Sequence, residues 1–245
     1  MLSKAQNKYI RSLTQQKYRN EYKVFPAVGA KIVEEWLCSN VKVQMIIAVA
    51  GWLDKNTALI ARHPEAIVHI VSDEELTILS GMQTPNQVMI VVPMPATAAI
   101  PEINEWCIAL DGIQDPGNMG TIIRIADWFG IKQIVCGANC VDIYNPKVVQ
   151  SAMGSHLRVT IYDADLNVFL TEVTIPRIAA TLGGDNIYTV NSPEAGVLII
   201  GNESKGISAQ ILKHATQQVM IPRRGGAESL NAAVSTGILC ALLIR

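Results

Sequence analysis

The sequence predicts an α/β protein of two domains, the second built on a parallel sheet with helices on both faces. Short apolar runs rich in Val and Ile alternate with helical stretches along the whole chain. In the second half these runs are continuously apolar, as strands are when both faces of a parallel sheet are buried. A stretch of prolines and small residues at 93–104 separates the halves. We therefore expect domains at 1–95 and 105–245, joined by a linker at 96–104.

The first domain is predicted to begin with a polar, basic N-terminal arm. A small α/β fold comes after this arm. Ser72, followed three residues later by Glu75, is typical of a capping box that opens a helix. The expected strands are 23–28, 43–50, 66–72 and 87–93, and the expected helices are 30–39, 55–63 and 72–81.

The second domain repeats the alternation of strands and helices. Its last segment, 229–245, is predicted to be a helix with Ser229 as N-cap and an almost wholly apolar body, which indicates deep burial or a dimer interface. The expected strands are 106–113, 132–137, 158–163, 177–184 and 196–203, and the earlier helices are 118–130 and 145–156.

Composition favours a cytoplasmic protein with a substantial core. The 245 residues are 49% hydrophobic, and the basic N-terminus lacks the apolar centre of a signal peptide. The longest apolar runs fall short of the roughly 20 residues that span a membrane. Five cysteines in apolar surroundings do not suggest a disulfide framework. Cys136 and Cys140 have no accompanying cluster of ligands, so we expect buried structural thiols and no metal.

Charge is unevenly distributed along the chain. The formal net charge is −1, yet residues 1–33 hold seven Lys or Arg and one acidic residue, Glu21. A local basic arm can contact RNA phosphates whatever the total charge. The alternative is a solvated amphipathic helix.

Three segments of the second domain, 110–130, 198–208 and 220–235, each begin at a strand end and continue into a loop. Ligands of open α/β sheets bind outside the carboxyl ends of strands. Taken singly, each segment has an ordinary structural explanation. Asn118 could cap a helix, Arg124 could pair with Asp127, and the Asn202–Glu203 loop could be turn chemistry. Arg223 and Arg224 suit a phosphate partner or a solvated loop, and no G-x-G-x-x-G fingerprint is present.

In order and together, DPGNMGTIIRIADWFG, IIGNESKGIS and IPRRGGAESLNAAVS resemble the three motifs of the SpoU (TrmH-like) class of knotted RNA methyltransferases. The resemblance covers 106–245. The first domain is similar to the ribosomal-protein-like RNA-binding domain often fused to this class. It departs from that pattern at Val28, where the class usually has a glutamate before the glycine, and Ser204 replaces a common glycine in the second motif.

The resemblance implies a C-terminal domain with a deep trefoil knot that binds S-adenosylmethionine and methylates a ribose 2′-oxygen. Backbone groups of Leu182, Gly201, Ile221 and Leu230 would hold the donor, although these leucines and Ile221 could equally be core residues. A guanidinium holds its proton too tightly to serve as a base by itself, so the arginine would orient the ribose and its phosphate. The catalytic set that the resemblance implies is Arg124, Asn118, Ser229, Asn231 and Glu203.

Three functions remain open at this stage. The first is RNA 2′-O-methyl transfer, with ribosomal RNA preferred over transfer RNA because of the extra RNA-binding domain. The second is a catalytically silent RNA-binding or ribosome-assembly factor of the same fold, and the intact set of site residues speaks against it. The third is a nucleotide-dependent oxidoreductase, which lacks its glycine fingerprint. We expect a homodimer that binds RNA and neither a metal nor a membrane.

Overall fold

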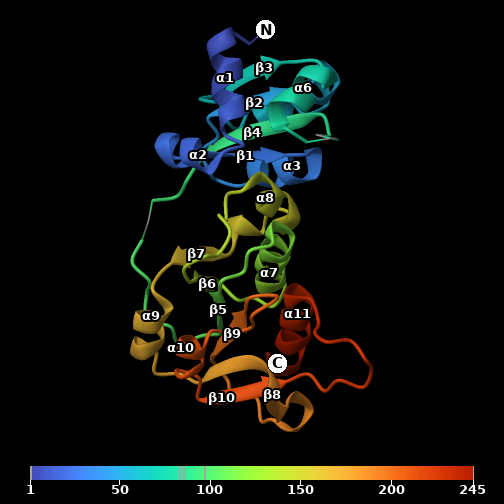
Figure 1. Cartoon of the computed structure of the whole chain (residues 1–245). Helices are drawn as coiled ribbons and strands as arrows, with labels where there is room; N and C mark the ends of the chain where they lie inside the picture. Colours follow the sequence, from blue (N-terminus) through green and yellow to red (C-terminus); the bar gives the residue numbers. More distant parts are fainter. Residues whose placement is uncertain (1, 83, 85, 97, 245) are drawn as a thin grey trace. The chain divides into compact units, whose positions relative to one another are not determined.

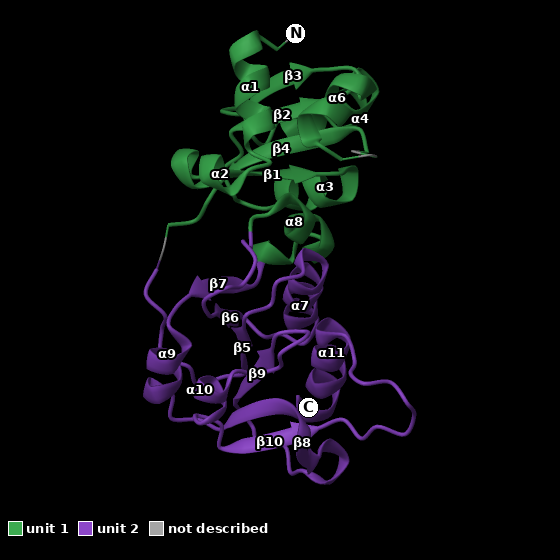
Figure 2. Ribbon diagram, viewed as in Figure 1, with its two compact units in different colours: residues 1–96, 144–157 green, residues 97–143, 158–245 purple. Residues whose placement is uncertain are grey.

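The computed structural model describes residues 2–82, 84, 86–96 and 98–244. Met1 and Arg245, at the ends of the two expected domains, and Thr97 of the expected linker 96–104 lie outside the described residues. Packing separates the chain into two compact units (Figure 2). Unit 1 comprises residues 1–96 and 144–157, and unit 2 comprises residues 97–143 and 158–245.

Unit 1 contains a four-stranded sheet of order β1-β4-β2-β3, in which only the β2–β3 pair is parallel (Figure 1). The strands are β1 (Val24–Val28), β2 (Met45–Ala48), β3 (Ile67–Ile70) and β4 (Val88–Pro93). The helices of residues 2–82 are α1 (Lys4–Ser12), α2 (Gln16–Tyr22), α3 (Ala30–Cys38), α4 (Ala50–Lys55), α5 (Thr57–Ile60) and α6 (Asp73–Ser80).

Alternation along the strands gives this sheet two buried faces. Phe25 and Ala27 of β1 face a core that includes α3, whereas Val24 and Val28 of the same strand face a core that includes α1 and α6. Successive side chains of a strand point to opposite faces, so the two clusters follow directly from the apolar run. Val28, at which the first domain departs from the pattern of the RNA-binding domain, is therefore a core residue.

Residues 144–157 pack in unit 1 although they follow β6 in the chain. They contain α8 (Pro146–Ala152) and the short helix η1 (Ser155–Leu157). Tyr144 stacks on Phe25 with ring centroids 4.5 Å apart, and Val149 is buried in the same core as Trp36. An amphipathic helix buries its apolar face against whatever surface lies beside it, so its pattern does not reveal which sheet it will cover.

Local signals in unit 1 had mixed outcomes. The capping box is confirmed, because Ser72 and Glu75 each bond the other's backbone N–H. The helix expected at 55–63 is wrong in its bounds, since α4 ends at Lys55 and α5 covers only Thr57–Ile60.

Arg19 of the basic arm is buried and donates to the Leu13 carbonyl at 2.8 Å. That arginine therefore supports the α1–α2 turn and cannot meet a phosphate.

Unit 2 contains a six-stranded, wholly parallel sheet of order β10-β8-β9-β5-β6-β7. The expected parallel sheet is thus confirmed. Its strands are β5 (Cys107–Asp111), β6 (Gln133–Cys136), β7 (Thr160–Asp163), β8 (Arg177–Asn186), β9 (Val197–Gly201) and β10 (Gln217–Met220). Its helices are α7 (Pro116–Trp128), α9 (Leu166–Glu172), η2 (Ile187–Thr189), α10 (Ala209–Leu212) and α11 (Ala232–Leu243).

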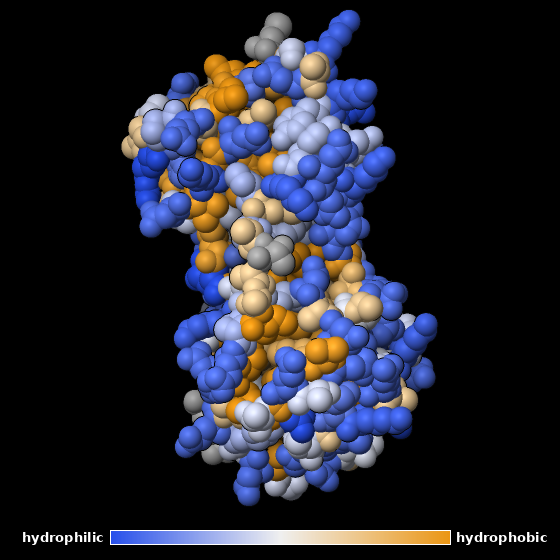
Figure 3. Space-filling model, turned by 90° about the vertical axis from the view of Figure 1, so that its left-hand side faces the viewer, coloured by the Kyte–Doolittle hydropathy of each residue, from blue (hydrophilic) through white to orange (hydrophobic). Residues whose placement is uncertain are grey.

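Helices cover both faces of this sheet. Side chains of α9 and α10 share a core with Cys107 and Ala109 of β5. Helices α7 and α11 contact one another, and they also contact β6 and β9 respectively (Figure 1). No helix within the described residues is long and apolar enough to cross a membrane. Figure 3 shows one face of the molecule, on which hydrophilic side chains predominate and hydrophobic ones form smaller groups.

Strand β8 carries a bulge that brings backbone against backbone. Consecutive residues Gln218 and Val219 of β10 pair with Ala179 and Asp185 of β8, so residues 180–184 loop out between the two partners. A Cβ built on Gly184 would lie 2.5 Å from the carbonyl carbon of Gln218. Only glycine permits this approach, because any side chain would collide with the β10 backbone.

We predict that Gly184→Ala destabilises unit 2 whereas Gly183→Ala does not. Both changes reduce the freedom of the unfolded chain equally, but nothing lies within 4 Å of a Cβ on Gly183. Overpacking at Gly184 is expected to cost about 1–3 kcal/mol. Urea unfolding followed by circular dichroism measures the difference. Equal midpoints for the two variants would show that the β8–β10 contact yields without cost.

Candidate active site

The carboxyl ends of neighbouring parallel strands bring two of the three predicted segments together. Asp111 at the end of β5 pairs in register with Gly201 at the end of β9. Beyond the strands, the Asn202 side chain donates to the Gly112 carbonyl at 2.7 Å. The Asp111 carboxylate accepts from the Ser208 N–H at 2.7 Å. These contacts hold the loop after β9 against the loop after β5.

A chain of side-chain hydrogen bonds then joins all three segments. The Asn118 amide nitrogen donates to Glu203 Oε1 at 2.9 Å. The Asn118 amide oxygen accepts from the Asn231 amide nitrogen at 2.7 Å. Asn118 lies on α7, Glu203 follows β9, and Asn231 opens α11. Residues 113 positions apart in the sequence therefore meet, and each amide has a defined orientation.

Asn231 also caps α11, which corrects the expected cap at Ser229. Its side-chain oxygen accepts from the N–H groups of Ala233 and Val234. Ser229 is exposed in the preceding loop. Both residue types are good caps, and the choice depends on tertiary contact with Asn118. The Asn231 side-chain oxygen thus accepts from the first turn of α11, and its nitrogen donates to Asn118. Asn231 therefore connects the start of the helix to the site.

The ordinary explanations for Asn118 and Arg124 are both wrong. Asp115 caps α7 and accepts from the Asn118 N–H at 2.8 Å, so Asn118 is free to use its side chain elsewhere. Asp127 is bound by Arg158, whose Nε and Nη2 both donate to the carboxylate at 2.8–2.9 Å. Asp115 before Pro116 is a helix-start signal from which sequence reasoning could have found this cap.

Arg124 lies apart from the hydrogen-bonded chain. It is exposed on α7, and within the described residues it has no ion pair. Six residues along a helix correspond to about 9 Å of rise and to a rotation of roughly a third of a turn from Asn118. Arg124 thus projects from a different face of α7 than the side chain that meets Glu203.

Of the predicted donor-binding positions, Leu182 lies within β8, Gly201 ends β9, Ile221 follows β10, and Leu230 precedes α11. Leu182 is in the β8 bulge and 77% exposed, and Leu230 is 48% exposed, so neither is the core residue that the alternative suggested. Ile221 follows β10 and is partly buried. A Cβ on Gly201 would lie 2.2 Å from the Gly206 carbonyl carbon, so only glycine fits there.

The thiols differ in exposure and acidity. Burial raises the pKa of Cys107 and of Cys240 to about 12, which makes both inert. A hydrogen bond with Cys136 lowers the pKa of Cys140, and the same bond together with burial raises that of Cys136. Of the pair expected to be buried, Cys136 is buried and Cys140 is only partly buried, whereas Cys38 is exposed. The described residues contain no group of three or more His, Cys, Asp or Glu arranged to hold a metal ion.

Both halves of the chain match known protein families. Residues 105–241 match the SpoU rRNA Methylase family, and residues 4–90 match the MRM3-like substrate binding domain. The 23S rRNA (guanosine(2553)-2'-O)-methyltransferase RlmP of Bacillus subtilis is 30% identical over 239 residues, which are 94% of this chain and 92% of that protein.

Solved structures resemble the whole chain. A TrmH-family protein from Porphyromonas gingivalis superposes with a TM-score of 0.87 at 34% identity, covering 99% of this chain and 98% of that one. An AdoMet-bound rRNA methyltransferase from Sinorhizobium meliloti superposes with a TM-score of 0.86 at 28% identity, covering 99% and 96%.

We predict that Asn231→Ala lowers the free energy of unfolding by about 1 kcal/mol through loss of the cap, whereas Asn231→Asp does not. Aspartate caps α11 equally well but cannot donate to Asn118. If the Asn118 amide then flips to donate to residue 231, its oxygen faces Glu203 instead. Thermal melts of the two variants separate capping from the hydrogen-bond chain. An Asn231→Ala protein as stable as wild type would show that the cap contributes nothing.

Proposed function

The chain belongs to the SpoU rRNA methylase family, and from this premise we propose that it methylates a ribose 2′-oxygen of ribosomal RNA. The activity is RNA 2′-O-methyl transfer, and the methyl donor is S-adenosylmethionine. The observation that carries the site assignment is the hydrogen-bonded chain Glu203–Asn118–Asn231, since it unites all three motifs. A silent assembly factor would have no need of three oriented polar side chains at the strand ends.

The residues present fit this donor. S-adenosylmethionine bears no phosphate, and the strand ends offer backbone groups, two exposed leucines and the close-packed Gly201 in place of a phosphate loop. We propose that Leu182, Gly201, Ile221 and Leu230 hold it, within the trefoil knot of the family. When bound, the donor would supply a sulfonium methyl group for the ribose oxygen; the C–S electron pair would stay on sulfur and the hydroxyl proton would leave to water.

The chain's own residues position the acceptor. A ribose hydroxyl is a weak nucleophile, so holding it in line with the methyl group supplies much of the rate. Glu203 fixes the amide of Asn118, and Asn231 fixes it from the other side. Ser229 is exposed in the loop before Asn231, and we assign it to contact with the RNA. We assign Arg124 to orienting the ribose and its phosphate, because a guanidinium donates hydrogen bonds and does not accept protons.

We propose a homodimer that forms through α7 and α11. Val234 on α11 is 51% exposed and Trp128 on α7 is 83% exposed, while Ile125 and Gly237 pack the two helices together. Large apolar side chains gathered on adjacent helices favour burial against a partner. Arg124 and Trp128 lie four residues apart on one face of α7, so a second copy would cover the surface from which Arg124 projects. We infer that Arg124 of one subunit serves the site of the other.

Sedimentation should therefore show a dimer at micromolar concentration, and a monomer would contradict this proposal. Mixing Arg124→Ala with Asn231→Ala subunits tests the shared site. Mixed dimers regain part of the activity if Arg124 acts across the interface. They stay inactive if both residues must come from one subunit.

We predict that Arg124→Ala lowers methyl transfer to 23S rRNA by about 10²- to 10³-fold, as the loss of an oriented charge-assisted contact does. Donor affinity and melting temperature should stay near wild type, because the contact forms mainly with the reacting ribose. Lys213→Ala, which removes another exposed charge from unit 2, is the matched control. Transfer from labelled donor is measured for each protein. Near wild-type turnover in Arg124→Ala would remove the arginine from the mechanism.

A further inference from the structure

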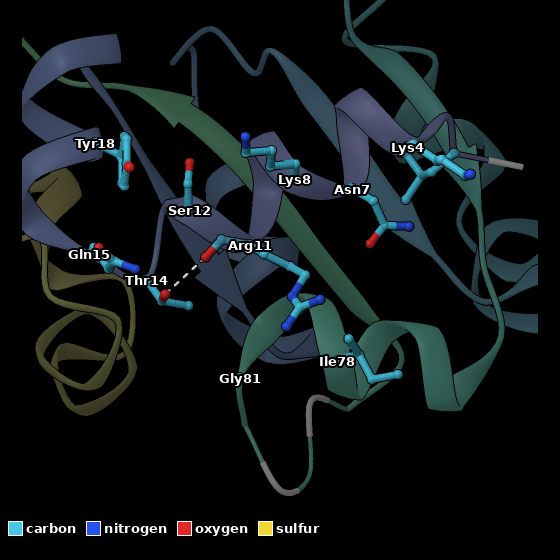
Figure 4. Close-up of a pocket in the computed structure, with 11 residues that line it drawn as sticks. Lys4, Asn7, Lys8, Arg11, Ser12, Thr14, Gln15, Tyr18, Ile78 and Gly81 are labelled. Atoms are coloured by element: carbon cyan, nitrogen blue, oxygen red, sulfur yellow. Dashed lines mark hydrogen bonds between the residues drawn. The ribbon is translucent and has the colours of Figure 1, made fainter.

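A groove of about 670 Å³ lies on unit 1 and is lined only by residues of that unit. It runs along α1 and is closed on its other sides by the start of α2 and by α6 (Figure 4). Its volume falls in the range of about 300–1,000 Å³ that is usual for sites binding small ligands or single nucleotides. The residues that matter below are Lys4, Lys8, Arg11, Gln15, Tyr18 and Ile78.

Three cations form one edge of this groove. Lys4, Lys8 and Arg11 are spaced at i, i+4 and i+7 on α1, so they follow one helix face over about 10 Å. All three are exposed, and none of the described residues that line the groove is acidic. No salt bridge to them is found in the described part of the chain. Figure 4 shows the Arg11 guanidinium extended toward Ile78 and Gly81 of the opposite wall.

An aromatic ring and uncharged polar groups complete the lining. Tyr18 lines the groove and stacks on Tyr22, with centroids 6.2 Å apart and planes 17° from parallel. Lys17 lies 5.7 Å from the Tyr18 centroid. Asn7 and Gln15 add amides that can donate and accept. Positive charge for phosphates, a ring for a base and amides for base edges are therefore all present in one groove.

We propose that this groove binds an unpaired stretch of the RNA substrate. This inference rests on the proposed function, since RNA is the substrate on which the site in unit 2 acts. Bases in single strands are free to stack on aromatic side chains, with the backbone held by cations. A duplex keeps its bases stacked internally and is recognised across its minor groove, which neither Tyr18 nor a narrow groove would serve.

The test compares two double variants that remove the same charge from unit 1. Lys8→Gln with Arg11→Gln removes two groove cations, and Lys42→Gln with Lys55→Gln removes two exposed cations outside it. The full-length proteins are titrated with a fluorescent ten-nucleotide oligouridylate over a range of salt concentrations. Each single-strand phosphate contact contributes about 0.7 to the slope of log K against log salt, so the groove variant should lose roughly 1.4. The control variant should retain the wild-type slope.

Stacking is tested separately through Tyr18. Tyr18→Phe keeps the ring and should bind oligouridylate like wild type. Tyr18→Leu keeps an apolar side chain without the ring, and it should lose about 5-fold to 100-fold in affinity, the range for one stacked base. Melting temperatures of all variants show whether unit 1 remains folded.

Several outcomes would overturn the inference. Equal losses in the two double variants would show diffuse electrostatic attraction, and equal binding of oligoglutamate would show a site for acidic peptides. Tighter groove-dependent binding of a ten-base-pair RNA duplex would show that paired RNA is the ligand. Methyl transfer and donor binding by the wild-type chain are measured alongside. If the wild-type chain transfers methyl groups but the groove variant binds RNA as well as wild type, only the groove proposal is rejected. If RNA binding depends on the groove but no methyl transfer occurs, only the proposed function is rejected.

Discussion

The side chain of Asn118 is the contact on which the site depends. Its amide nitrogen donates to Glu203, and its amide oxygen accepts from the Asn231 amide nitrogen. Asn231 in turn gives its oxygen to the start of α11. A strand-end loop, a helix interior and a helix start are thereby fixed to one another. Because reversal of either amide would bring two oxygens together, the arrangement has one favourable state.

The sheet makes this meeting possible. All six strands of unit 2 are parallel, so the ends of β5 and β9 lie side by side and their loops share one edge. Two glycines then allow the backbone to pack more closely than side chains would permit, Gly184 against Gln218 and Gly201 against Gly206. The same close packing turns the β8 bulge outward and leaves Leu182 exposed beside the edge. The segments that carry Asn118 and Glu203 therefore both leave the sheet at this edge.

The sequence could predict those features of the fold that depend on the pattern of neighbouring residues. Apolar runs predicted the parallel sheet, and Ser72 with Glu75 predicted a helix start, because each signal acts within a few residues. Three features depend on tertiary partners and were missed. The cap of α11 is Asn231 rather than Ser229 because Asn118 lies beside it. Residues 144–157 pack with Phe25, and Arg19 is buried under the α1–α2 turn, although neither pattern names its partner. The motif residues themselves were identified by resemblance, since their spacing alone allowed ordinary caps and pairs.

The central claim is that this chain places a methyl group on a ribose of ribosomal RNA. Mass-spectrometric mapping of 2′-O-methyl groups in ribosomal RNA from cells with and without the gene tests it most directly. We expect a specific ribose methylation in 23S rRNA to disappear with the gene and to return with wild-type protein. Identical methylation of ribosomal RNA in both cells, with a loss confined to transfer RNA or to no RNA at all, would contradict the account.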